Sequence, residues 1–228
     1  MSPILAGVAL AVTAGAVIAT SSREARAALI GLTLVLGLGP FLAEPLPGPA
    51  LLGARVVTGI LVAYVLWAAA GTVEVRGLGS RIGWPAEAML AVAAATAGVA
   101  IASTLASLEP GSAAPIAGPL DALTPSGLIL GAGLALAAIG LAPALLGRVS
   151  LRATIGLLLL TQGVALARTG IAGAPGELEQ LGVDGILLAV GVAGALIAGA
   201  ARSAAAGGVA GAGAAGRGAA VAAPPGRP

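Results

Sequence analysis

The chain contains no cysteine and no histidine, and its cationic residues are all arginine. Without cysteine it forms neither disulfides nor thiolate metal sites, and without histidine it lacks the commonest general base and haem ligand. The Gly-x-Gly runs lie inside apolar segments, where no phosphate would reach them. We therefore expect no catalytic residue, no metal site and no cofactor.

Charge is also scarce. Only 9% of the 228 residues are charged, whereas 58% are hydrophobic, and the mean hydropathy is +1.07. Soluble domains carry about 25% charged residues, so this composition indicates that lipid surrounds most of the chain. The eleven basic residues outnumber the nine acids, but the arginines are scattered singly and form no basic stripe. Nucleic-acid binding is therefore not expected.

Apolar runs separated by charged or Pro/Gly-rich breaks predict an all-α, polytopic membrane helix bundle with about seven transmembrane helices. Most runs approach the roughly 20 residues that cross a bilayer. They lie near 3–20, 27–43, 49–70, 85–105, 126–146, 153–170 and 185–201. The second run is interrupted by glycines and Pro40. We expect a transmembrane domain over 1–202 and a disordered, Ala/Gly-rich cytoplasmic tail over 203–228.

Arginine is unevenly distributed among the connections between these runs. The first, third and fifth connections and the segment after the last run carry it, namely Arg23, Arg26, Arg76, Arg81, Arg148, Arg152 and Arg202. The charged residues of the other three connections are all acidic, namely Glu44, Glu109, Asp121, Glu177, Glu179 and Asp184. Because cytoplasmic loops retain positive charge, this alternation predicts an N-out/C-in, multi-pass protein, which we assign to the bacterial cytoplasmic membrane.

Arg55 is a candidate functional residue because it lies inside the third apolar run. Thr58 follows one turn later on the same helix face. An ionisable group in lipid costs several kcal/mol, so its presence calls for an explanation. Either Arg55 faces the bundle interior near an ion or proton path, or it extends to the outer interface or pairs structurally with Glu44. These interpretations stay open.

The sixth run carries a polar stripe. Thr154, Thr161 and Arg168 follow one another at seven-residue spacing, and Gln162 lies near the expected membrane centre. Such a stripe should face protein rather than lipid. It is a candidate for a hydrated path, although hydrogen bonding between helices explains it equally well, with Arg168 reaching the outer interface.

Glu87 is a further candidate, at the start of the fourth run. It follows Trp84-Pro85. Proline at the first helical position and an acid in the first turn are typical of a helix N-terminus. This local role is sufficient to explain Glu87.

The stretch from 147 to 201 resembles a known family. It reads Gly-Arg-Val-Ser-Leu-Arg-Ala-Thr-Ile-Gly, an apolar helix with Gln162-Gly163, then Ala174-Pro175-Gly176-Glu177-Leu178-Glu179, and a last helix before Arg202. This order resembles the hydrogenase-4 component E family, small membrane subunits of formate-hydrogenlyase-like and related complexes. The C-terminal part of that family is similar to the K-type subunit of respiratory complex I and the C-type subunit of multisubunit sodium/proton antiporters.

The resemblance implies membership of a multisubunit, proton-translocating complex. Arg55-Val56-Val57 falls where the family tends to place an intramembrane lysine. There is also a departure, because the family's carboxylate in the sixth helix would fall at Thr161, followed by Gln162-Gly163. Without that carboxylate, the resemblance favours a structural or accessory role.

Three functional hypotheses follow. The first is a non-catalytic membrane subunit of an ion-translocating redox or antiporter-like complex, with other membrane subunits and the lipid bilayer as partners. The second is a small transporter or permease that works alone. The third, a membrane enzyme, is disfavoured by the missing nucleophile and metal ligands.

The predicted orientation is testable with topology reporters. A C-terminal reporter that is active only in the cytoplasm should be active, because the Arg-bearing connections are retained there. The matched fusion of a reporter that is active only outside the cytoplasm should be silent. The reverse pair of results would contradict the N-out/C-in orientation.

Overall fold

The computed structural model describes residues 3–22, 24–43, 46, 48–70, 84–107, 124–147 and 150–221. Within these residues, the regular structure consists of seven α-helices and one short 3-10 helix. They are α1 (Pro3–Ser21), α2 (Ala25–Leu38), η1 (Gly39–Leu42), α3 (Pro49–Ala70), α4 (Trp84–Ser107), α5 (Pro125–Leu146), α6 (Ser150–Ala172) and α7 (Glu177–Val221). The predicted all-α bundle is therefore confirmed.

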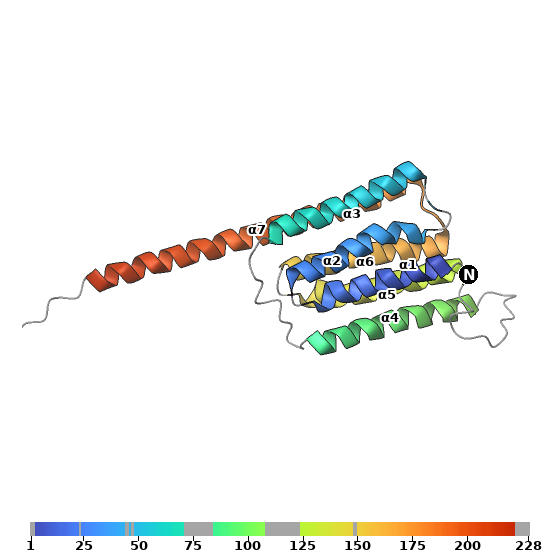
Figure 1. Cartoon of the computed structure of the whole chain (residues 1–228), viewed down its shortest axis with the longest axis horizontal. Helices are drawn as coiled ribbons and strands as arrows, with labels where there is room; N and C mark the ends of the chain where they lie inside the picture. The colour runs from blue at the N-terminus through green and yellow to red at the C-terminus, as the bar shows by residue number, and fades with distance from the viewer. Residues whose placement is uncertain are drawn as a thin grey trace, which may run out of the picture.

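The helices have the length and composition of membrane spans. Six described segments are long and apolar enough to cross a bilayer, with α2 and η1 together forming one of them, Ala25–Leu42. In α4 the apolar stretch among the described residues is shorter, Ala88–Ile101. Successive helices alternate in direction along the bundle (Figure 1), so the ends of α1, α3 and α5 lie at one end. The described residues that flank the Arg-bearing connections lie at that end, and its cytoplasmic location stays a prediction.

The last helix differs most from its expected bounds. It begins at Glu177 rather than near 185, and it continues as helix to Val221, well past the bundle (Figure 1). Gly173, which has a φ of 81°, follows the end of α6, and Glu177 and Glu179 occupy the first turn of α7. Acids in the first turn interact favourably with the helix dipole. The helix continues past Ala201, so no change of secondary structure marks the expected domain boundary at 202.

The helices are arranged around a central group of α1, α2, α5 and α6. α4 packs against α5 and α1, whereas α3 and α7 pack on each other and reach the central group through α2 and α6. The largest fully buried side chains include Leu32, Leu66, Leu136, Leu158 and Leu159. The pair α3–α7 therefore lies at one edge of the bundle.

Glycines line the contact between α5 and α6, which is the most extensive helix–helix contact among the described residues. Glycines recur every seven residues on both helices. On α5 and its C-cap they are Gly133, Gly140 and Gly147, and on α6 they are Gly156, Gly163 and Gly170. A Cβ on Gly140 would lie 2.7 Å from both the Gly156 carbonyl oxygen and the Leu160 amide nitrogen. Lipid supplies no hydrophobic drive between apolar helices, so close backbone approach and van der Waals packing hold this pair.

Proline breaks the second span, as the sequence indicated. Pro40 has no amide hydrogen, so the carbonyl of Leu36 lacks the donor that an α-helix would place four residues later. The chain continues as the 3-10 turn η1 instead. Gly59 of α3 packs against the last turn of α2 before this break. A Cβ on Gly59 would lie 3.2 Å from the Leu36 carbonyl oxygen.

The α5–α6 contact predicts that a glycine-to-alanine substitution changes the free energy of unfolding differently at two positions. Gly140→Ala should destabilise the protein by about 1–3 kcal/mol, because the added methyl meets backbone atoms of α6. Gly7→Ala is the control. No atom lies within 4 Å of its added methyl, and replacing a helical glycine should be neutral or stabilising by up to about 1 kcal/mol. Thermal unfolding in detergent, followed by circular dichroism, measures both, and equal melting temperatures would contradict the packing.

Candidate functional site

A buried ion pair joins α3 to α7. The Nε of Arg55 donates to Oδ1 of Asp184 at 3.3 Å, and the side chains are only 6% and 10% exposed. Each residue lies two turns into its helix, so the pair lies about 10 Å inside the span from the end that carries the acidic connections. Both charges are thus withdrawn from the surface and paired with each other.

The pair belongs to a continuous contact between two helices that run in the same direction. Seven residues beyond Arg55 on α3 comes Val62, and seven beyond Asp184 on α7 comes Gly191. A Cβ on Gly191 would lie 2.8 Å from Cγ1 of Val62. The same helix faces therefore meet through charge near one end and through close apolar packing deeper in the bundle.

Gln180 adds a further buried polar group to α7. It lies one turn before Asp184, which places both on one helix face. The residue is only 2% exposed, and its Nε2 has no hydrogen-bond partner among the described residues. A buried donor without an acceptor lowers the stability of the folded protein. The Nε2 of Gln180 is therefore a donor that remains available on this face of α7.

Arg55 thus faces the interior rather than the outer interface, and its partner is one that the sequence did not suggest. Glu44, the partner considered from the sequence, lies outside the described residues, and Thr58 is half-buried on the same helix. Asp184 was assigned to a connection because the last helix was expected to begin after it. The two acids that follow Pro175-Gly176 are the sequence signal for an earlier helix start, which places Asp184 inside the helix.

Gln162 lies inside the bundle, against the break in the second span. It is 2% exposed, and a Cβ on Gly39 of η1 would collide with its side-chain amide. Gln162 is ten residues from the end of α6, which puts it about 15 Å inside the span, near the middle of a bilayer of about 30 Å. Glycine at position 39 is therefore what leaves room for this polar side chain.

The polar residues spaced seven apart on α6 do not line one continuous hydrated path. The hydroxyls of Thr154 and Thr161 both donate to carbonyls of their own helix, at 2.8 Å from Ser150 O and Leu157 O. Thr154 is buried against Gly194 of α7, whereas Thr161 is only half-buried. The threonine hydroxyls are thus engaged locally.

Arg168, the last member of that stripe, lies near the C-terminal end of α6. It forms an ion pair of 2.5 Å with Glu179 of α7, with side chains 41% and 42% exposed, and its Nη1 donates to the Gly173 carbonyl at 3.4 Å. Because the pair is open to its surroundings, it contributes little to stability.

The remaining candidate, Glu87, lies in the first turn of α4, as expected, and its side chain is outside the described residues. Within the described part of the chain, no three acidic side chains come together in a way that would hold a metal ion.

No protein-family model, no curated protein and no solved structure matches the chain.

The buried pair predicts non-additive effects of substitution. Asp184→Leu should destabilise the protein by about 3–5 kcal/mol, because it leaves a buried guanidinium that cannot lose its charge. Arg55→Leu should cost less, since the carboxyl left behind can bind a proton. The double variant should recover most of the loss because neither charge remains. A thermal double-mutant cycle measures the coupling, and additive effects of the two substitutions would show that the charges are independent.

Proposed function

We propose that this multi-pass helical membrane protein is a non-catalytic subunit of an ion-translocating redox or antiporter-like complex, similar to hydrogenase-4 component E, in the bacterial cytoplasmic membrane. The observation that carries the proposal is the buried pair of Arg55 and Asp184 between α3 and α7.

A comparison within the molecule supports a role for these charges beyond packing. The helices α5 and α6 associate tightly through glycine, alanine and leucine, without any ion pair between them among the described residues. Replacing a buried ion pair by apolar residues is often neutral or stabilising. Helix association alone therefore does not require Arg55 and Asp184, and ionisable groups at this depth are candidates for function.

The position of the pair suits an accessory role beside an ion-conducting neighbour. It lies in the two helices at the edge of the bundle, whose outer faces expose large apolar side chains such as Ile60, Tyr64 and Ile186. Those faces allow another membrane subunit to approach. In an apolar surrounding, fixed charges act strongly on an ion or proton that moves nearby.

The resemblance supports the same assignment. Arg55 takes the position where the family tends to carry an intramembrane lysine, which keeps a cation in the third helix. Thr161 stands where the family has a carboxylate. Its hydroxyl is engaged with the Leu157 carbonyl, so the proposed role is to shape the field around a translocation path in a neighbouring subunit rather than to relay protons.

Purification tests membership of a complex. The tagged chain, extracted from its native membrane in mild detergent, should migrate with a larger assembly that contains antiporter-like, hydrogenase or quinone-reductase subunits. Recovery of only a monomer or homodimer would contradict the proposal and favour a small transporter that works alone. The same preparation carrying an unrelated tagged membrane protein controls for nonspecific association.

A pair of double variants separates function from stability. Arg55→Leu/Asp184→Leu should assemble with a melting temperature near that of the wild type but reduce ion translocation by about tenfold, equivalent to about 1.4 kcal/mol. Arg168→Leu/Glu179→Leu is the matched control, because it removes an exposed ion pair that also involves α7. Ion translocation by each double variant is measured in vesicles reconstituted with the assembled complex. Equal activity of the two variants would assign the buried pair a structural role only.

A further inference from the structure

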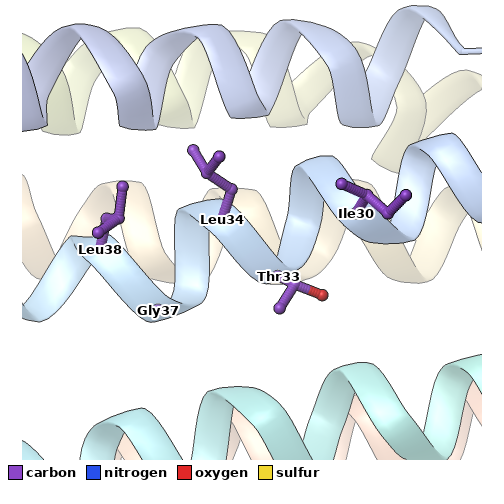
Figure 2. A pocket seen from close by; sticks show the side chains of 5 residues that line it. All are labelled: Ile30, Thr33, Leu34, Gly37 and Leu38. Carbon is purple, nitrogen blue, oxygen red and sulfur yellow. The ribbon is translucent and has the colours of Figure 1, made fainter.

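An apolar groove runs along one side of α2. It has a volume of about 550 Å³ and is lined by Ile30, Thr33, Leu34, Gly37 and Leu38. In Figure 2, α2 lies between α1, in darker blue, and α3, in cyan, with these five residues along its visible face. The lining positions recur every three or four residues, so the groove follows the helix axis.

The lining admits only an apolar occupant. Ile30, Leu34 and Leu38 present hydrocarbon, and the hydroxyl of Thr33 already donates to the Leu29 carbonyl at 2.7 Å. Gly37 has no side chain, and nothing lies within 4 Å of where its Cβ would be. The groove therefore offers shape and hydrocarbon contact but no unused hydrogen-bond donor.

A positive charge stands at one end of the groove. Arg26 precedes Ile30 by four residues, so it lies on the same helix face one turn nearer the start of α2. It is exposed, and it forms no ion pair within the described part of the chain. The nearby acid Glu24 is the N-cap residue, in extended conformation before the first turn of α2, and it forms no ion pair with Arg26. The start of α2 adds the positive end of the helix dipole.

The length of this arrangement corresponds to one leaflet. From Arg26 to Leu38 is twelve residues, or about 18 Å along the axis, and half of a bilayer's hydrocarbon core is about 15 Å. Arg26 is the second residue of the span Ala25–Leu42, so its guanidinium lies at headgroup level. The groove then begins one turn deeper and ends near the middle of the bilayer.

We propose that this surface is a binding site for an anionic phospholipid, with the phosphate held by Arg26 and one acyl chain lying in the groove between Ile30 and Leu38. The site is at the end of the bundle that carries the Arg-bearing connections, and anionic lipids are attracted to basic residues at that level. The inference concerns α2 alone and is independent of the proposed membership of a complex.

Lipid binding to the purified full-length chain tests this site. After delipidation in detergent, the chain is titrated with phosphatidylglycerol or with phosphatidylethanolamine, and native mass spectrometry counts the bound lipids. We expect one phosphatidylglycerol to bind about fivefold more tightly than phosphatidylethanolamine, as one arginine near the surface predicts. Arg26→Gln should abolish this preference while leaving the helical content unchanged.

Two glycine variants test the groove itself. Gly37→Leu places a side chain in the groove and should reduce the retention of both lipids. Gly7→Leu is the matched control, because it adds the same side chain at another open glycine, on α1, with nothing within 4 Å of its Cβ. It should bind lipid as the wild type does.

Several results would overturn the proposal. Equal binding of the two lipids, or a preference that survives Arg26→Gln, would show that Arg26 holds no phosphate. A homodimer that Gly37→Leu dissociates would assign the groove to a second copy of the chain. Competition by inorganic phosphate together with normal binding to the Gly37→Leu variant would indicate an anion site that does not use the groove.

Discussion

Close contact between helix backbones is the interaction on which the rest of this bundle depends. In lipid, apolar side chains gain little by leaving their surroundings, so helices associate where small residues let them approach. Gly140 meets Gly156 between α5 and α6, and Gly15 meets Gly31 between α1 and α2. Gly98 brings α4 onto Ala135 of α5 in the same way. These contacts form the central group, and the other helices are placed relative to it.

The α3–α7 pair uses a different means of association, and this difference is what makes it informative. It combines a tight contact at Gly191 with the ion pair of Arg55 and Asp184. A charged pair inside a span holds two helices in one register and also sets a local electric field. Gln180, whose Nε2 has no hydrogen-bond partner among the described residues, lies one turn away. The buried charges among the described residues thus lie at one edge of the bundle, whereas the buried polar residues elsewhere, such as Gln162, are uncharged.

The break in the second span links two parts of the structure. Pro40 ends the regular α2 helix, Gly39 makes room for Gln162 of α6, and Gly59 of α3 packs on the Leu36 carbonyl. Just before the break, Gly37 leaves the groove open on the opposite side of the same helix. One short stretch of sequence therefore supports both a buried polar contact and an apolar surface for lipid.

Hydropathy along the chain is enough to predict an all-α membrane bundle of about seven apolar helices, because apolar runs are local and can be counted. It also marks Arg55 as a charge inside an apolar run, but it leaves open what that charge faces. The packing of whole helices makes Asp184 the partner of Arg55 and brings Gln162 against Gly39. It also sets the contacts of Gly140 and Gly156. In a chain so rich in glycine and alanine, many helix faces have suitable spacing, and which of them meet depends on how whole helices pack, which no local pattern specifies.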